Sequence, residues 1–277
     1  MIYLVTDSTA CISRMEAREL NAIVVPMHYI KSGREAFQEG FIEDWQPLAD
    51  QNLAEYSTAQ APTSAFLDVF SRLKEQGHQA LCLTISSRLS GTYANALKAS
   101  EEIGDGFVVV DSRTTAGAMY LLLKEARRLL DSGIGLEACF ERLKELRNKT
   151  HTIFTIQDME PLRRSGRLGF MRSSVSTLLN LRPLLTLQDG SVVSHSLARG
   201  KQDQLRQMLL GLDTKSSQVI VQNCADEEAA EVLSQRLKEK GMKVLRRRIG
   251  IVLAIHLGIP ILSTAWMEAA QEDSTDL

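Results

Sequence analysis

One short segment, Leu81-Cys82-Leu83-Thr84-Ile85, constrains the fold more than any other. Its residues are almost continuously apolar and lack the alternation of a strand with one face in water, so they predict a strand buried on both faces. Such strands belong to parallel sheets covered by helices. The residues that follow, from Ser86 to Thr92, then lie at the carboxyl edge of the sheet, where open α/β sheets bind ligands.

The rest of the first half repeats this alternation of short apolar segments with longer amphipathic ones. It predicts an α/β domain over residues 1–151, built on a parallel sheet with flanking helices. The predicted strands are Ile2–Asp7, Val24–Ile30, Ala80–Ser86 and Phe107–Asp111, and the predicted helices are Ala65–Gln76, Gly91–Ile103, Thr114–Ser132 and Leu136–Lys149.

The second half has a different pattern, which predicts a mixed α+β domain over residues 152–277. The apolar stretch from Ile249 to Trp266 is interrupted by His256, two glycines and Pro260, so two short buried strands around a turn fit it better than a membrane span. The other predicted strands are Thr152–Ile156, a hairpin of Arg182–Leu187 with Ser191–Leu197, and Gln218–Gln222, and the predicted helices are Val175–Leu181, Lys201–Leu212 and Asp226–Gly241.

Composition and missing motifs exclude several classes of protein. The formal net charge of −2 favours no nucleic-acid partner, and the run Arg246-Arg247-Arg248 fits either a solvated strand end or a contact patch. Four cysteines without a CxxC pair and an N-terminus without a secretory signal predict a cytoplasmic protein. The motifs GxGxxG, GxxxxGK, GxSxG and HExxH are absent and the histidines lack metal-ligand spacing, so no metal or nucleotide cofactor is expected.

The strongest local feature is the loop from Ser86 to Thr92, which joins the buried strand to a helix. Hydroxyls and free N–H groups at a helix N-terminus suit a carboxylate or phosphate, although Ser90 fits a helix cap equally well. Asp7-Ser8-Thr9 and the segment Thr58–Ser64 each fit a cap or turn when taken alone. Their expected convergence at one edge of the sheet favours a binding site.

Candidate residues of the second half are cationic or isolated. The segment Arg163–Gly169 combines three arginines with glycines that allow close approach of the backbone. Arg199 and His256 stand alone, and His256 fits a hydrogen-bonded core histidine as well as a site residue. A serine hydrolase based on Ser90 would need Asp7 or Asp111 with His256, brought together from distant positions.

In order along nearly the whole chain, these segments resemble the DegV family. The Ser-Ser-x-Leu-Ser-Gly-Thr-Tyr block is the most specific of them. The matching segments are Val5-Thr6-Asp7-Ser8-Thr9-Ala10, Thr58 with Gln60, Ile85 to Tyr93, Val110-Asp111-Ser112, Ser165-Gly166-Arg167-Leu168-Gly169, Leu181-Arg182-Pro183-Leu184-Leu185, Arg199-Gly200 and His256-Leu257-Gly258.

The chain departs from the usual family pattern at three places. Ala59 and Ala61 replace the serine and proline of Thr-Ser-Gln-Pro, which removes one hydroxyl from the expected head-group site. Cys11 stands where an aspartate is common, and Ile259-Pro260 replaces the Pro-Gly that ends the familiar His-x-Gly-Pro-Gly. These changes affect the expected head-group geometry and the partner surface.

The resemblance implies a protein that binds one long-chain fatty acid between two α/β domains and does not catalyse a reaction. It implies that the carboxylate is presented to a fatty acid kinase, in the service of phospholipid metabolism, and that the fatty acid is the only bound small molecule. Carried over to this sequence, the ligand-binding residues are Thr58, Ser90, Gly91, Thr92, Arg167, Asp7 and Ser8, and the residues of the partner or phosphoryl-transfer surface are Arg199 and His256. The alternatives are an acyl- or phosphoryl-transfer enzyme that uses Ser90 and a lipid-responsive regulatory protein.

Overall fold

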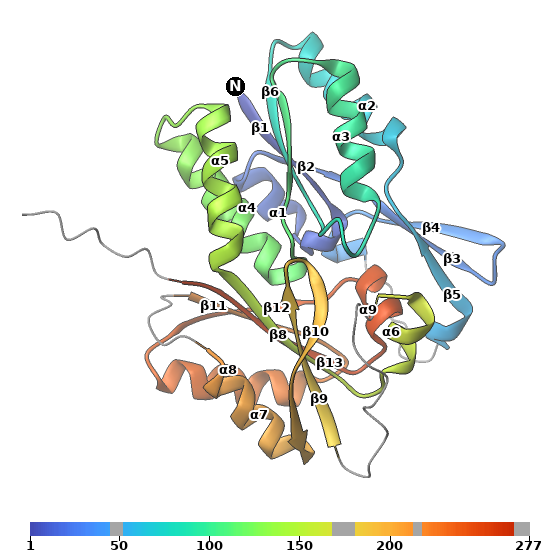
Figure 1. Cartoon of the computed structure of the whole chain (residues 1–277), viewed down its shortest axis with the longest axis vertical. Coiled ribbons are helices and arrows are strands. Elements are labelled where there is room, and N and C mark those ends of the chain that lie inside the picture. The colour runs from blue at the N-terminus through green and yellow to red at the C-terminus, as the bar shows by residue number, and fades with distance from the viewer. Residues whose placement is uncertain (45–51, 168–180, 213–217, 269–277) are drawn as a thin grey trace, which may run out of the picture.

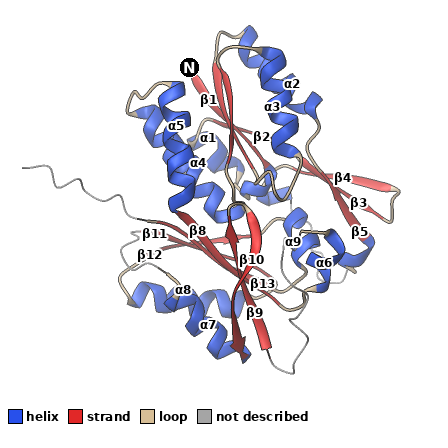
Figure 2. Cartoon of the chain, in the orientation of Figure 1, coloured by secondary structure: helices blue, strands red, loops and turns tan. Residues whose placement is uncertain are grey.

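The computed structural model describes residues 1–44, 52–167, 181–212 and 218–268. This part of the chain forms a four-stranded, a six-stranded and a three-stranded sheet. The four-stranded sheet and its helices lie above the six-stranded sheet, and the three-stranded sheet projects to one side (Figure 1, Figure 2). In the described residues, no helix has the length and apolar character that crossing a membrane requires.

The four-stranded sheet confirms the predicted parallel α/β fold. Its strands run parallel in the order β2-β1-β6-β7, with β2 at Ala22–Val25, β1 at Ile2–Asp7, β6 at Gln79–Thr84 and β7 at Phe107–Asp111. Leu81 and Leu83 of β6 pack in the core with α4 (Ala116–Asp131) and α5 (Leu136–Leu146). Ala80 and Cys82 pack in the core with α2 (Thr63–Glu75) and α3 (Thr92–Ile103). The continuous apolar pattern of β6 therefore reflects helices on both faces.

The three-stranded sheet was not predicted. It consists of the antiparallel strands β4 (Glu35–Glu39), β3 (Met27–Lys31) and β5 (Tyr56–Ala59). The expected single strand Val24–Ile30 is divided at Pro26, which has no N–H for a sheet ladder. The chain before Pro26 stays in the parallel sheet and the chain after it joins the small sheet, where Tyr29 stacks on Phe37 with ring centroids 5.1 Å apart.

The six-stranded sheet is mixed, as predicted for the second half. Its order is β10-β9-β8-β13-β11-β12, and only the β11–β12 pair is parallel. The strands are β8 (Thr150–Ile156), β9 (Leu181–Gln188), β10 (Ser191–Arg199), β11 (Gln218–Cys224), β12 (Lys243–Arg248) and β13 (Ile261–Met267), with helices α7 (Gly200–Leu210) and α8 (Glu227–Glu239) beside them. The predicted hairpin is confirmed as β9–β10. The predicted helix Val175–Leu181 lies outside the described residues except for Leu181, which opens β9.

The prediction of two strands between Ile249 and Trp266 was wrong in its first half. Residues Ile251–Leu257 form helix α9, and only β13 is a strand. Ile251, Val252 and Ile255 pack in the core of the first half of the chain, next to β3 and β5. The first five residues of α9 are all buried, so the sequence of this helix shows no amphipathic period. Its β-branched residues also favour a strand by propensity alone. Because α9 joins the first-half core, the division at residue 151 stays a prediction.

Arg247 of β12 joins the two halves of the molecule at one edge of the six-stranded sheet. Its side chain is only 6% exposed and forms an ion pair with Glu16 of α1 (Arg14–Glu19). Its guanidinium also donates to the Cys11 carbonyl at 2.5 Å and lies 3.9 Å from the ring centroid of Tyr120. Arg247 is therefore neither a solvated strand end nor part of a contact patch. Its buried side chain connects the two halves of the molecule.

We expect Arg247→Met to lower the free energy of unfolding by about 3 kcal/mol, because the partly buried Glu16 carboxylate is left without its cation. Arg246→Met is the matched control: the neighbouring Arg246 pairs only with exposed Glu227 and Glu231, so its loss should cost less than about 1 kcal/mol. Urea denaturation followed by circular dichroism measures both. Equal losses of unfolding free energy in the two variants would show that Arg247 does not connect the two halves.

Candidate functional site

An apolar cavity lies between the four-stranded and six-stranded sheets. Its enclosed volume is about 70 Å³, and its volume counted with its opening to solvent is about 660 Å³. Both halves of the chain supply its walls. The lining residues are Ile85, Leu89, Thr115 and Ala116 from the first half, and Thr152, Phe154, Leu162, Arg167, Leu187, Val192, Ile249, Leu253, His256, Leu257, Ile261 and Ser263 from the second.

A polar cleft adjoins the apolar cavity, because Arg167 and His256 line both. Its volume, counted in the same way, is about 770 Å³. The remaining lining comes from residues 54–58 of the first half and from Pro161, Arg164, Ser165 and Ile255. An apolar space that ends at cationic side chains suits an amphiphile with an anionic head group.

His256 and Thr58 meet at the junction of cavity and cleft. The His256 Nε2 and Thr58 Oγ1 atoms are 2.6 Å apart, which joins α9 to β5. Burial, with the nearby charges of Arg167 and Arg164, lowers the pKa of His256 to about 4, so the ring is neutral at pH 7. When the Thr58 hydroxyl donates to Nε2, the ring proton lies on Nδ1. That atom is buried and has no hydrogen-bond partner among the described residues.

Arg167 is a cation held in place without a carboxylate partner in the described part of the chain. Its Nε donates to the Leu89 carbonyl at 3.2 Å, and its Nη1 donates to the Ser165 carbonyl. Arg163, in α6 (Glu160–Ser165), instead forms an exposed ion pair with Glu160. Of these two arginines, only Arg167 lines the apolar cavity, and its charge remains free to bind an anion.

The predicted loop residues Ser90, Gly91 and Thr92 form the start of α3. Ser90 Oγ lies 2.9 Å from Thr92 Oγ1 and accepts from the Thr92 N–H at 3.3 Å, which forms a local turn just before the N-cap residue Gly91. Gly91 lies against the exposed Gln60 side chain, whose Oε1 would be 2.2 Å from an added Cβ and would have to move aside. None of the three is among the lining residues of the cavity or the cleft. They adjoin Leu89, which lines the cavity and holds Arg167.

Asp7 and Ser8 hold the edge of the parallel sheet together. Asp7 is fully buried and accepts from the N–H groups of Thr9 at 3.0 Å and Ile85 at 2.7 Å, and its burial raises the pKa of the carboxyl group. Ser8 Oγ accepts from the Met27 N–H at 3.2 Å. Neither residue lines the cavity or the cleft. Through Ile85, Asp7 fixes one wall of the cavity.

Arg199 lies at the junction of β10 and α7, away from the lining of both spaces. Its side chain is exposed, and its backbone N–H donates to Asp203 at 2.8 Å. The structure therefore does not bring Arg199 and His256 together in the cavity or the cleft.

The residues considered for a serine hydrolase do not form a triad. His256 bonds to Thr58, Ser90 bonds to Thr92, and Asp111 accepts from Ser87 Oγ at 2.6 Å. Asp7 bonds to Thr9 and Ile85, as described above. In the described residues there is also no cluster of three or more histidine, cysteine or acidic side chains that could hold a metal ion.

Sequence reasoning missed Glu39, the last residue of β4, whose buried carboxylate lies against the start of α9. Its side chain accepts from the Val252 N–H at 3.0 Å, and an added Cβ on Gly250 would lie 2.6 Å from its Oε1. Burial raises the pKa of Glu39 to about 7. The residue positions α9, and with it His256. The only sequence signal was an isolated acidic residue in a strand that was not recognised.

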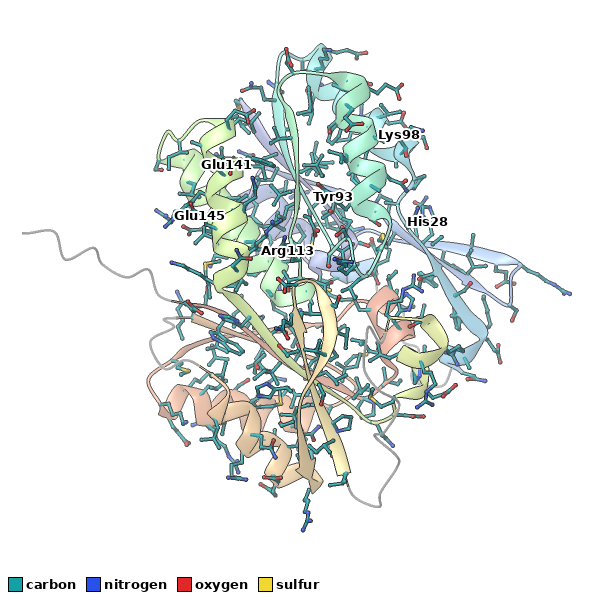
Figure 3. The ribbon with its side chains drawn as sticks, viewed as in Figure 1. His28, Tyr93, Lys98, Arg113, Glu141 and Glu145 are labelled. Carbon is teal, nitrogen blue, oxygen red and sulfur yellow. The ribbon has the colours of Figure 1, made fainter. Side chains whose placement is uncertain are left out.

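The turn of the β9–β10 hairpin contacts the loop after β6, next to the strand residues Leu187 and Val192 that line the apolar cavity. Ser86 Oγ donates to the Gly190 carbonyl at 2.8 Å. A Cβ added at Gly190 would lie 2.2 Å from Ser86 Oγ. Gly190 also has a φ of +81°, which favours glycine. Arg113 lies beside the turn (Figure 3) and pairs with Asp189 at 3.6 Å.

The fold and site define an α/β protein of three sheets with an apolar cavity that ends in a cationic polar cleft. The chain belongs to the DegV family: the family model described as "Uncharacterised protein, DegV family" matches residues 1–269. DegV domain-containing proteins of Halalkalibacterium halodurans and Clostridium perfringens are 28% and 26% identical to it, and each comparison covers 96% of this chain and 98% of the relative.

Solved structures of the family share the whole fold. A DegV family protein from Thermus thermophilus, described for its fatty acid binding, is 28% identical with a TM-score of 0.87, over 97% of this chain and 99% of that one. DegV of Bacillus subtilis, described as a fatty acid binding protein, has a TM-score of 0.83 at 22% identity, over 97% of this chain and 99% of that one. These likenesses confirm the predicted family and fold class.

The lowered pKa of His256 predicts a pH-dependent stability. The ordinary value is 6.5, so the unfolded chain takes up this proton first and the free energy of unfolding falls as pH drops from about 6.5 to about 4. In the His256→Gln variant, the free energy of unfolding should fall by about 3 kcal/mol less over this pH range. Urea titrations of both proteins at the two ends of this range measure the difference. An unchanged fall would mean that His256 titrates normally.

Proposed function

We propose that this protein binds one long-chain fatty acid, with its acyl chain in the apolar cavity and its carboxylate at the polar cleft. The observation that carries the proposal is the position of Arg167 and His256, which line both spaces and have polar atoms free for a ligand. The Thermus thermophilus relative, described for its fatty acid binding, supports the same class of ligand.

The acyl chain supplies most of the affinity in this proposal. Burial of about 16 carbons at roughly 0.8 kcal/mol per methylene offers on the order of 10 kcal/mol before the costs of association. Each hydrogen bond to the charged carboxylate adds about 1.5–3 kcal/mol. The tail therefore sets the strength of binding, and the head-group residues set the orientation.

The head group meets three side chains from separate elements. The Arg167 guanidinium supplies the charge, His256 Nδ1–H supplies a neutral donor, and Thr58 keeps the imidazole in that tautomer. In our proposal Ser90 Oγ exchanges its bond with Thr92 for one to the carboxylate, and the adjoining N–H groups of Gly91 and Thr92 add a positive end of a helix. Asp7 and Ser8 act indirectly, by holding the loop that carries Ile85.

The wider role that we propose is that of a cytoplasmic carrier in phospholipid metabolism. A tail in the apolar cavity leaves the carboxylate in the open polar cleft, where a fatty acid kinase can transfer phosphate to it. We assign Arg199 to the surface that docks the kinase, since its side chain is exposed and belongs to no lining. His256 lines the cleft in which we propose the head group lies, so its proposed contribution to phosphoryl transfer is made there.

The purified protein should contain about one long-chain fatty acid per chain, detectable by native mass spectrometry and lipid extraction. Removal of the lipid should lower the melting temperature, because a ligand that binds only the folded state stabilises it. If no lipid is extracted and added palmitic acid leaves the melting temperature unchanged, the proposed function is wrong.

Arg167→Ala should weaken palmitic acid binding by roughly tenfold or more, the scale of one charge-assisted hydrogen bond. Arg163→Ala is the matched control, because this neighbouring arginine forms only an exposed pair with Glu160. Fluorescence titration with delipidated protein compares the two. A similar affinity in both variants would remove Arg167 from the head-group site.

Arg199→Ala should bind fatty acid normally but support little acyl phosphate formation when a compatible fatty acid kinase and ATP are supplied. Arg206→Ala in the adjoining helix α7 is the control, since Arg206 pairs with Asp203 on the surface. Full activity of the Arg199 variant would exclude it from the partner surface, and lost fatty acid binding would place it in the site.

A further inference from the structure

Three hydroxyl side chains interrupt the apolar lining of the cavity. They are Thr115, just before α4, Thr152 of β8 and Ser263 of β13. The head-group residues Arg167, Thr58 and His256 do not bond to them, and the proposed function gives them no part. Ser263 is only 4% exposed and is among the lining residues of the cavity, so its hydroxyl is shielded from bulk water.

The strand register places the hydroxyls along the acyl path and not at its head. In the β8–β13 pair, Ile261 lies opposite Ile156, Ser263 opposite Phe154 and Ala265 opposite Thr152. At about 3.4 Å per residue, Ser263 lies about 7 Å beyond Ile261, and Thr152 lies about 14 Å beyond it. Ile261 follows α9 and His256 along the chain, so the hydroxyls face the middle or far part of a bound tail.

The hydrogen-bond state of these hydroxyls leaves one donor and two acceptors for a ligand. Thr152 Oγ1 donates to the Thr264 carbonyl at 2.9 Å, and Thr115 Oγ1 donates to the Thr9 carbonyl at 3.4 Å. Both oxygens keep lone pairs. The Ser263 hydroxyl has no protein partner within the described ranges, and contact with a plain alkyl chain would leave it unpaired, which costs free energy.

We infer that Ser263, Thr152 and Thr115 select a fatty acid whose chain carries a hydroxyl group. The ligand hydroxyl accepts from Ser263 and donates to Thr152 or Thr115, so both of its hydrogen-bonding functions are met inside the cavity. A site with hydrogen-bonding groups for a ligand hydroxyl discriminates against the analogue that lacks it. The inference rests on the proposed function, because it needs the acyl chain in this cavity.

The test compares stearic acid with a panel of hydroxystearic acids whose hydroxyl moves from mid-chain to the methyl end. Delipidated protein should bind one or two adjacent isomers about three- to tenfold more tightly than stearic acid, the scale of one or two neutral hydrogen bonds. Ser263→Ala should abolish the preference without weakening stearic acid binding. Thr152→Val, which keeps the shape and removes the acceptor, should reduce the same preference.

Ser194→Ala is the matched control, because Ser194 is an exposed strand serine that lines neither space. It should keep the wild-type preference. If stearic acid binds and no hydroxylated isomer binds more tightly, or if Ser263→Ala keeps the preference, the inference is wrong and the proposed function stands. If no member of the panel binds, the proposed function itself is wrong.

Discussion

The burial of helix α9 in the core of the first half is the interaction on which the site depends. Ile251, Val252 and Ile255 pack with the strands and helices of residues 1–111, although α9 lies near the other end of the chain. Glu39 bonds to its first turn, and His256 of its last turn bonds to Thr58. The apolar helix thus carries a histidine to the junction of cavity and cleft, while Leu253 and Leu257 form the cavity wall.

The elements that could be predicted are those whose pattern depends on local periodicity. Leu81 to Ile85 predicted a doubly covered parallel strand, and the segments Arg182–Leu187 and Ser191–Leu197 predicted the β9–β10 hairpin. The failures depend on contacts from elsewhere in the chain. Pro26 divides one apolar run between two sheets, and α9 is buried all round, so neither segment shows the period of its own structure.

The residues of the candidate site were also predicted only in part from the sequence. Thr58, Arg167 and His256 were proposed from distant segments, and the structure brings all three to the polar cleft. Asp7 and Ser8 were placed at the correct edge of the sheet, but their polar atoms bond to backbone groups beneath the loop. Sequence position indicates the edge on which a residue lies, whereas the direction of a side chain depends on backbone donors supplied by neighbouring strands.

The close contact between Gly190 and Ser86 has a kinetic consequence. The β9–β10 hairpin and β12, which carries Arg247, stand at opposite edges of the six-stranded sheet. Separation at the hairpin edge breaks a neutral hydrogen bond and an exposed ion pair, each worth about 1 kcal/mol or less, whereas separation at the other edge breaks a buried ion pair. The hairpin edge is therefore held by weaker polar contacts than the Arg247 edge, and we expect the release of a molecule enclosed between the sheets to depend on how often these contacts break.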